Sequence, residues 1–445
     1  IDLNLASIDA TTMPGTITTS RTALNVSGKA QTLDVSTVAP AGVSIIISKT
    51  APGPSGPTSA AKFSVPKNGS TTFWVTISAP SVAAGQYVGR ITLTPEAAGF
   101  NPVTIPVAFV KTQGAVTLSQ SCSPTTMVVK TGQAHCTATV SNLAPATANA
   151  TLNVKNVDAP LGSLVYSNIS APGSALPAPG GVTWTGALTP SLPPQVTSIT
   201  DITGSGPAGG YLPLSLFGIA PISGVGDDTI TNFNVPTFFY GGEPYTRIGV
   251  VSNGYVVVGG GNASDINFFP QTFPNPARPN NVVAPFWTDL NPPAGGAVRI
   301  ATLTDGASTW LVVDYDAVKN FSNATTHTGE IWVRLATGSP GTGPSSEQLT
   351  VSYGTANAAS GDPGSSMNWG AENRDGTSGV NIASAPADNS EYRVTLTGPT
   401  AGGSVTITYD VSSKNVGTYR TRAAMTSDLT PGTTQIDVPL TITYP

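Results

Sequence analysis

Short runs in which apolar and polar residues alternate recur along the whole chain. They include TIT at Thr16–Thr18, TFWVTI at Thr72–Ile77 and SVTITYDV at Ser404–Val411. An alternation of period two is typical of β-strands that bury one face. No window of ten or more residues combines helical apolar spacing with helix caps. The pattern therefore predicts an all-β protein made of several β-sandwich domains.

Segments at the start of the chain define a first domain. At 445 residues the chain is too long for one sandwich of about 100 residues, so two to four domains are expected. The strand-like run VTIPVAFV at Val103–Val110 closes the first of them, and residues 112–114 form a short linker. We therefore place the first domain at residues 1–111.

A second sandwich starts at residue 113, but its closing strands are missing after Pro190. Strand-like segments of the expected kind occur about two hundred residues later, at Ser404–Val411, Gly417–Asp428 and Asp437–Tyr444. We therefore expect a discontinuous domain, residues 113–195 plus 398–445, with a larger β domain inserted at 198–397. The alternative is four domains in series, in which residues 398–445 would fold alone around a marginal core.

The composition of the chain restricts the kinds of partner and the cellular compartment that we expect for it. Charged residues are only 10% of the chain, and Gly 48 and Pro 39 suit short strands joined by tight turns. The net charge of −5 argues against nucleic-acid binding, and no apolar run is long enough for a membrane span. The chain starts at Ile1 without Met or a signal peptide, which suggests a processed fragment. We expect a secreted or cell-surface protein.

The two cysteines, Cys122 and Cys136, flank a stretch that we interpret as a strand, a turn at Thr131-Gly132 and the start of the next strand. A disulfide between them fits an exported protein, and the alternative is a pair of reduced, buried thiols. No CxxC motif is present, which argues against redox catalysis or a zinc knuckle.

Five blocks near the start of the chain resemble the fibronectin-III-like domain that follows the catalytic domain of many subtilisin-like serine peptidases (subtilases). The blocks are LNLASI at Leu3–Ile8, TSRTALNVSG at Thr19–Gly28, APAGVSI at Ala39–Ile45, TTFWVTI at Thr71–Ile77 and GQYVGRITLT at Gly85–Thr94. The matching residues are Leu3, Asn4, Ser7, Ile8, Arg21, Thr22, Asn25, Val26, Pro40, Gly42 and Val43. The resemblance implies that this chain is the non-catalytic C-terminal region of a secreted bacterial subtilase.

Two further resemblances concern the rest of the chain. The second sandwich is similar to repeated β-sandwich modules of bacterial surface proteins. The inserted domain resembles β modules appended to secreted bacterial peptidases and, more distantly, the nidogen-type domain. Its blocks are Phe233–Gly261, Arg278–Pro292, Asp305–Val318, Glu330–Ala336, Glu347–Gly354 and Asn368–Ile382.

Residues that could suggest catalysis lack the required context. GTSG at Gly376–Gly379 is similar to the segment that carries the subtilase nucleophile, but the usual Met-Ala or Met-Ser continuation is absent. His135 and His327, the only histidines, do not occur in the sequence context of a subtilase base. A triad of that family also requires an α/β fold. We therefore expect no catalytic residues in this chain and place the triad of the serine endopeptidase in the parent protein.

Candidate ligand-binding residues have simpler structural interpretations. Asp227 with Asp228, or Asp314 with Asp316, could supply oxygen atoms to calcium, although calcium needs about six to eight ligands. We favour solvated turns at these acids and expect no cofactor. We expect Trp287 to pack in the core and Trp310 to be a half-buried strand residue. A carbohydrate-binding platform would use Phe238, Phe239, Tyr240 and Trp369, for each of which core packing is the better interpretation.

Three functional hypotheses follow. In the first, the chain stabilises a secreted subtilase and positions its protein substrate, so that its partners are its own catalytic domain, protein substrate or a surface polymer. In the second, it is a cell-surface adhesion or matrix-binding protein whose inserted domain holds the partner. In the third, the inserted domain is a carbohydrate-binding module.

Overall fold

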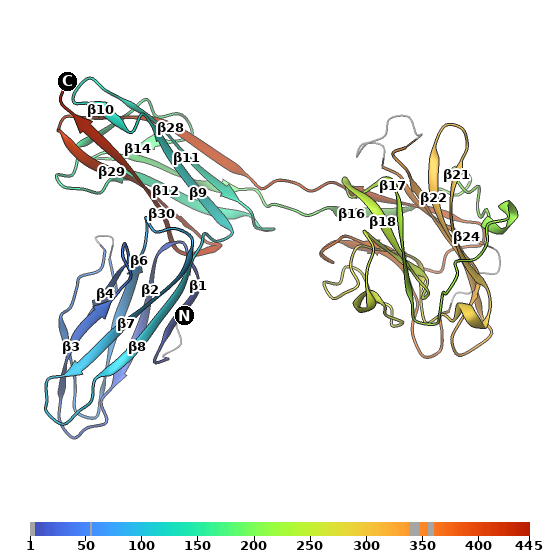
Figure 1. Ribbon diagram of the computed structural model, residues 1–445, viewed down its shortest axis with the longest axis horizontal. Coiled ribbons are helices and arrows are strands. Elements are labelled where there is room, and N and C mark those ends of the chain that lie inside the picture. Colours follow the sequence, from blue (N-terminus) through green and yellow to red (C-terminus); the bar gives the residue numbers. More distant parts are fainter. Residues whose placement is uncertain (1–4, 54–55, 338–346, 355–359) are drawn as a thin grey trace. The chain divides into compact units, whose positions relative to one another are not determined.

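The computed structural model describes residues 5–53, 56–337, 347–354 and 360–445, and it confirms the prediction of an all-β protein (Figure 1). Leu3 and Asn4, which belong to the subtilase-like pattern, lie outside the described residues. The helical elements among these residues are the 3-10 turns η1 (Leu214–Phe217), η2 (Ala263–Asp265) and η3 (Pro292–Ala294). Within the same ranges, no helix has the length and apolar character needed to cross a membrane.

The chain divides into two compact units. The first consists of Ile1–Ser191 together with Ala401–Pro445, and the second, here called the inserted unit, is Leu192–Thr400. The first unit contains two hydrophobic cores, one in each of two β-sandwiches. The inserted unit has one main core and two smaller clusters.

The first sandwich packs a five-stranded sheet against three strands of a second sheet. Alternate residues of its strands point inward, so that Phe73, Val75 and Ile77 are buried on one strand and Ile105, Val107 and Phe109 on another. The five-stranded sheet has the order β1 (Ile8–Met13), β8 (Val103–Lys111), β7 (Gly85–Pro95), β3 (Gln31–Val38), β5 (Lys62–Val65). The opposing strands are β2 (Gly15–Leu24), β6 (Ser70–Ser78) and β4 (Ser44–Ser48).

The second sandwich combines strands from both ends of the first unit. β28 (Ser404–Ser413) pairs with β11 (Ala134–Asn142), and β29 (Gly417–Ser427) pairs with β12 (Ala148–Asn156), so strands before and after the inserted unit share one core. One sheet has the order β13 (Leu164–Ser167), β28 (Ser404–Ser413), β11 (Ala134–Asn142), β9 (Val116–Ser123). The other contains β14 (Ser174–Ala175), β15 (Val182–Leu188), β12 (Ala148–Asn156), β29 (Gly417–Ser427) and β30 (Thr430–Thr443), with β10 (Thr126–Val128) beside β30.

One sheet runs through both sandwiches of the first unit. β2 pairs with β30 through Gly15 and Thr16, which lie opposite Thr434 and Thr433. A Cβ atom on Gly15 would lie 2.6 Å from the backbone nitrogen of Gln435, closer than real Cβ contacts. Glycine is therefore required at this junction.

A disulfide joins Cys122 on β9 to Cys136 on β11, where the two residues lie directly opposite each other. The stretch between the two cysteines consists of a strand, a turn and the start of the next strand, as expected, but the first of these strands does not pair with β9 or β11. This strand is β10, which crosses to the other sheet and pairs with β30 in parallel. Hydrophobic burial explains the detour, because Met127 on β10 belongs to the core of the second sandwich.

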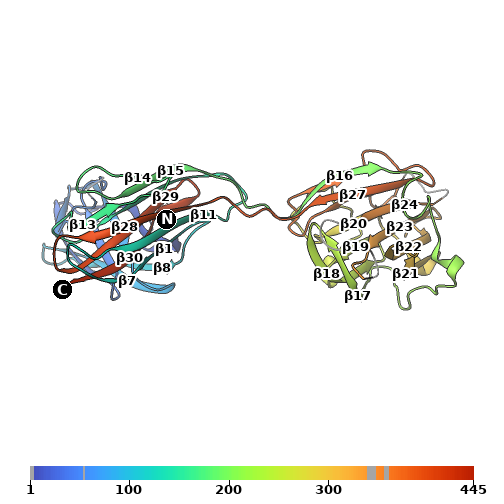
Figure 2. The ribbon, with the colours of Figure 1, turned by 90° about the horizontal axis from the view of Figure 1, so that it is seen from above.

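The inserted unit is built from two six-stranded sheets that face each other across the main core. The first sheet, shown in Figure 2, has the order β16 (Gln195–Asp201), β27 (Glu391–Thr397), β24 (Leu349–Tyr353), β23 (Thr326–Arg334), β22 (Thr309–Lys319), β21 (Ala297–Thr304). The second has the order β17 (Ile230–Tyr240), β18 (Glu243–Val251), β19 (Tyr255–Val258), β20 (Val282–Trp287), β25 (Asn368–Glu372), β26 (Gly379–Asn381).

Both sheets of the inserted unit are also covered on part of their outer faces. Phe273 packs with Tyr255 and Trp287 outside the second sheet, so β19 and β20 are buried on both faces. Their continuous apolar runs, rather than an alternation, follow from this double burial. Outside the first sheet, Leu214 packs with Trp310 and Trp332.

Candidate functional site

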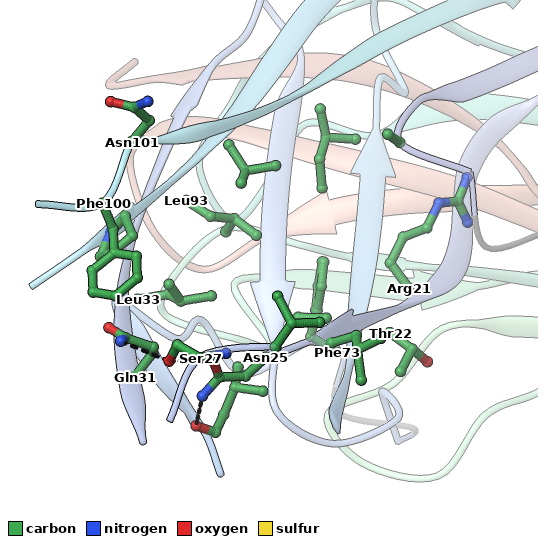
Figure 3. Close-up of a pocket in the computed structure, with 18 of the residues that line it drawn as sticks. Arg21, Thr22, Asn25, Ser27, Gln31, Leu33, Phe73, Leu93, Phe100 and Asn101 are labelled. Atoms are coloured by element: carbon green, nitrogen blue, oxygen red, sulfur yellow. Dashed lines mark hydrogen bonds between the residues drawn. The ribbon is translucent and has the colours of Figure 1, made fainter. Parts of the chain in front are cut away.

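A pocket of about 450 Å³ opens between the two sheets at one end of the first sandwich (Figure 3). Leu33, Leu93 and Ile105 line it from the five-stranded sheet, and Phe73 lines it from β6 on the opposite sheet. These side chains belong to the sandwich core or pack against it. The pocket is therefore an open end of the core, with apolar walls.

Apolar side chains also surround the mouth of this pocket, and we call Leu24, Val26, Phe100 and Val103 the pocket rim. Val26 is 85% exposed and Leu24 is 70% exposed. Single exposed apolar residues are common on protein surfaces, but a cluster around a concave pocket marks an interaction site.

Arg21, the charged residue in the pocket lining, is fully engaged with the backbone. Its Nε donates to the carbonyl of Leu5 at 3.0 Å, and its Nη2 donates to the carbonyl of Ser7 at 2.8 Å. Its Nη1 donates to the carbonyl of Ser20 at 2.7 Å. Arg21 thus attaches the segment before β1 to β2, beside the pocket. The remaining lining residues carry no formal charge.

Three polar side chains, Asn25, Ser27 and Gln31, form a hydrogen-bonded chain along the pocket, which we call the amide network. The Nδ2 of Asn25 donates to the carbonyls of Lys29 and Pro66, and its Oδ1 accepts the hydroxyl of Ser27 at 2.7 Å. The oxygen of Ser27 in turn accepts Nε2 of Gln31 at 3.1 Å.

The amide network determines which atom of Gln31 remains without a partner. The hydroxyl of Ser27 has two acceptors within reach, Oδ1 of Asn25 and the carbonyl of Lys29. Its proton points to one of these two, and its oxygen accepts Nε2 of Gln31. Gln31 is 7% exposed, and its Oε1 is buried with no hydrogen-bond partner. The pocket therefore contains one buried acceptor that lacks a donor.

The inserted unit has a different polar feature on the outer face of its first sheet. Arg299, Asp314, Glu330, Ser352 and Glu391 lie directly opposite one another on successive strands. We call Asp314, Glu330 and Glu391 the acid row. All three are completely buried. Buried carboxylates require hydrogen bonds or charge partners.

Residues 203–219, which we call the strap, cross over the acid row and supply these hydrogen bonds. The backbone amides of Ala208 and Gly210 donate to Glu391, at 2.9 and 3.0 Å. The next amides follow the row across the sheet, from Leu212 to Glu330 at 3.2 Å and from Leu214 to Asp314 at 3.0 Å. Every second backbone amide from Ala208 to Leu214 is thus bonded to a buried acid.

Burial in the acid row raises the pKa of Glu330 to about 8 and the pKa of Asp314 to about 6. Glu330 Oε2 accepts three donors, namely the amide of Leu212, the indole of Trp332 and the hydroxyl of Ser352. Its Oε1 has no partner, so a neutral carboxyl is favoured there. Arg299 brings a positive charge to one end of the row, and its Nη1 lies 4.0 Å from Asp314 and 2.7 Å from Asp316.

The strap ends in an exposed apolar tip at η1 (Figure 1). Leu216 is 72% exposed and Phe217 is 51% exposed, whereas Leu214 is buried against Trp310 and Trp332. No charged residue occurs between Asp201 and Asp227. The tip is a second apolar surface, and the buried hydrogen bonds of the strap hold its backbone.

The aromatic candidates from the sequence lie mainly in cores. Trp287 is fully buried and donates its indole N–H to the carbonyl of Asn267 at 2.7 Å. Phe238 and Tyr240 are buried in the main core of the inserted unit, while Phe239 and Trp369 are partly buried. Trp310, which we expected to be half-buried, is only 6% exposed because the strap covers it.

The acidic candidates are placed in two different settings. Asp314 and Asp316 lie on strand β22 beside Arg299, and Asp314 is fully buried, so our expectation of a solvated turn at these two acids was wrong. Asp227 and Asp228 belong to a group with Asp289 and Asp362, and burial, with the charges of these neighbours, raises the pKa of Asp289 to about 6. Within the residues that the structure describes, no group of three or more acidic, histidine or cysteine side chains is arranged to hold a metal.

The residues with a superficial similarity to a subtilase triad have separate structural roles. Ser378 accepts the amide of Val196 through its hydroxyl oxygen at 3.0 Å. His327 is fully buried in the inserted unit, with Nε2 at 2.9 Å from Asn320 Oδ1. His135 lies in the first unit, with Nδ1 at 2.6 Å from Asp410 Oδ1. These contacts place each side chain with a structural partner.

Sequence reasoning missed the amide network and the acid row. Gln31 carries no motif, and its role depends on the directions of the hydrogen bonds that join it to Ser27 and Asn25. For the acid row, one signal was present, because Asp314 and Glu330 each interrupt an apolar strand, in VVDYDAV and GEIWVR. A charge in such a run indicates a buried partner, but only the strand register shows that the two acids are neighbours.

Comparisons with known proteins give one family match. Residues 208–410, less than half of the chain, match a family model described as NIDO related. This region begins in the strap and ends in β28. No curated protein matches the chain.

Similarities to solved structures are weak. The chain is 12% identical to SSP-19, an MSP-domain protein of Caenorhabditis elegans, over 23% of this chain and 94% of that protein, with a TM-score of 0.17. It is 8% identical to the secreted serine protease VesC of Vibrio cholerae over 41% of each chain, with a TM-score of 0.19. It is also 8% identical to the C-terminal domain of the Streptococcus agalactiae AgI/II polypeptide BspA, over 99% and 98%, with a TM-score of 0.16. TM-scores this low carry no functional argument.

Proposed function

We propose that this chain is a non-catalytic, protein-binding region of a secreted subtilisin-like serine endopeptidase. The observation that carries the proposal is the open apolar end of the first sandwich, where the pocket rim is exposed. Arg21 holds residues 5–7 beside this opening. The subtilase-like sequence pattern of the same domain supports this assignment.

In this proposal the pocket rim contacts the catalytic domain of the parent enzyme or its protein substrate. Burial of exposed apolar side chains is favourable by about 25 cal/mol per Å². A docked partner would cover Leu24 and Val26, whose side chains now face solvent. The contact would stabilise the enzyme outside the cell and hold substrate near it.

The rim can be tested in the full-length protein. The coding sequence upstream of Ile1 is expected to specify an α/β domain with Asp, His and Ser blocks. In that protein, Leu24→Ser with Val26→Ser should shorten the half-life of casein-hydrolysing activity at elevated temperature or raise KM for protein substrates. Val88→Ser, at an equally exposed apolar residue outside the pocket, is the matched control. An upstream sequence without such a domain would contradict the proposal.

The isolated chain is expected to hydrolyse no casein, because the catalytic groups are assigned to the parent enzyme. The measurement is release of labelled peptides from casein with and without a serine-directed inhibitor. Inhibitor-sensitive hydrolysis by the purified chain would overturn this assignment.

A second candidate function is adhesion to a matrix or surface protein through the inserted unit. The observation in its favour is the exposed tip of Leu216 and Phe217 on an uncharged strap. Binding of the chain to immobilised matrix proteins, lost in Leu216→Ser with Phe217→Ser and retained in the rim variant, would support adhesion. The carbohydrate platform has less support, because Phe238 and Tyr240 are buried.

A further inference from the structure

We propose that the pocket of the first sandwich binds an uncharged protein segment that inserts one apolar side chain and donates a backbone N–H to Oε1 of Gln31. This inference rests on the proposed protein-binding function and specifies the chemistry of its partner. It follows from the pocket walls, the charge of the lining and the unpaired acceptor.

The walls select an apolar side chain. A volume of about 450 Å³ between Leu33, Leu93, Ile105 and Phe73 is within the range of specific binding pockets. The end of the sandwich core would be completed by a side chain of similar character. A charged group would lose its hydration there without gaining a counter-charge.

The lining also selects against charge of either sign. The guanidinium of Arg21 is already bonded to the carbonyls of Leu5, Ser7 and Ser20. The described lining contains no carboxylate. A neutral segment is therefore the occupant whose charge matches this surface.

The amide network specifies the hydrogen bond. Ser27 and Asn25 fix the amide of Gln31, so its carbonyl oxygen, rather than its NH₂ group, remains without a partner. A peptide N–H is a donor that accompanies every apolar side chain except that of proline. One segment can thus fill the pocket and supply the missing donor at the same time.

The test uses the intact chain and three small probes. N-acetyl-leucine methylamide carries an apolar side chain with two N–H donors, and its diester analogue replaces both N–H groups by oxygen. N-acetyl-lysine methylamide has the same donors and a charge. Binding is followed by methyl NMR of the wall residues Leu33, Leu93 and Ile105.

The amide probe should shift these methyl signals, and the diester should bind about tenfold more weakly, as expected for loss of one hydrogen bond. The lysine probe should not bind. Gln31→Leu should reduce the affinity for the amide to that for the diester. A thermal melt checks that this variant is folded, and Gln31→Met, a flexible replacement without the acceptor, provides a second test if it is not.

Equal affinity of the wild-type chain for amide and diester, or full retention of amide binding in the Gln31 variants, would overturn the inference. Shifts outside the pocket, or no shifts, would also overturn it. These results are distinguishable from failure of the proposed function. If the rim variant of the full-length peptidase loses stability while amide and diester bind equally, the proposed function is supported and the proposed hydrogen bond to Gln31 is rejected.

Discussion

The first sandwich leaves one end of its core open, whereas the inserted unit covers the outer face of its first sheet. In the first sandwich, the core ends in an open pocket, and the acceptor of Gln31 has no donor. In the inserted unit, the strap covers the outer sheet face and supplies backbone donors to Glu391, Glu330 and Asp314. We therefore expect the open pocket to bind a segment of another protein or domain. In the inserted unit, the strap is the segment that covers the sheet.

The strongest test of this comparison is to remove the first anchor of the strap. Glu391→Ala leaves the amides of Ala208 and Gly210 without acceptors. Each unsatisfied buried donor costs about 1–3 kcal/mol, so we expect the inserted unit to lose about 3 kcal/mol of stability. Urea unfolding read by pulsed hydrogen exchange should locate the loss in residues 192–400.

The matched control is Asp375→Ala, at a half-exposed acid of the same unit that pairs with Arg374 at 3.5 Å. Exposed ion pairs contribute little, so a change below about 0.5 kcal/mol is expected. An equally small loss in Glu391→Ala would mean that the strap is not held by the acid row.

A second test compares the pH dependence of the two units. The folded-state pKa values of Glu330 and Asp314 are raised, to about 8 and about 6. A raised carboxyl pKa stabilises the folded state below the unfolded pKa, and this stability is lost as pH rises through the folded pKa. Burial also raises the pKa of Glu372, in the same unit, to about 8. Between pH 6 and 8, Glu330 and Glu372 should each lower the stability of the inserted unit by about 2–3 kcal/mol, at about 1.4 kcal/mol per pH unit for each group.

In the first unit, by contrast, hydrogen bonds from Arg420, Asn168 and Asn149 lower the pKa values of Asp158, Asp410 and Asp428, respectively. Such carboxylates lose their contribution only as pH falls below the unfolded value near 4. We therefore expect little change in this unit between pH 6 and 8. In Glu330→Gln, the loss in the inserted unit over that range should fall to roughly half, because Glu372 still contributes. Persistence of the full loss would assign it to other groups.

A third, smaller effect is expected from the amide network. Asn25→Ala removes the donor that bonds the carbonyls of Lys29 and Pro66. The first unit should lose about 1–2 kcal/mol, and Gln31 should no longer be held by Ser27 in one orientation. The variant should also bind N-acetyl-leucine methylamide more weakly, while its affinity for the diester should not change. Unchanged amide binding would show that the network does not orient Gln31.

The smallest stability effect is expected at the pocket rim. Val26→Ser replaces a side chain that is 85% exposed, so the free energy of unfolding should change by less than about 0.5 kcal/mol. Binding of an apolar dye such as ANS should nevertheless decrease. A loss of stability without a change in dye binding would mean that Val26 is part of the core rather than of an interaction surface.

The all-β class could be predicted from the sequence because alternation is a local property. Segments such as Thr72–Ile77 and Ser404–Val411 carry it within eight residues, and both are in strands of the structure. The burial of Trp310 could not be predicted in the same way. It depends on the strap, a neutral segment without periodicity that lies about a hundred positions earlier in the chain.

The candidate sites were also difficult to predict from the sequence, for a related reason. Asp314 was considered as a calcium ligand with Asp316, its neighbour in sequence, whereas its partners are Glu330, the strap and Arg299. The vacant acceptor of Gln31 depends on how Ser27 and Asn25 use their hydrogen atoms. Both features are set by strand register and hydrogen-bond direction, which residue types alone do not specify.

The discontinuous second sandwich has a consequence for synthesis on the ribosome. β12 emerges early, but its partner β29 follows only after the whole of Leu192–Thr400 has been made. At about 5–20 residues per second, these 400 − 191 = 209 residues take roughly 10–40 s. The first sandwich and the inserted unit therefore have time to fold before the second sandwich can close. β30, which follows β29, then joins β2, so the sheet shared by the two sandwiches is completed only after the inserted unit has been made.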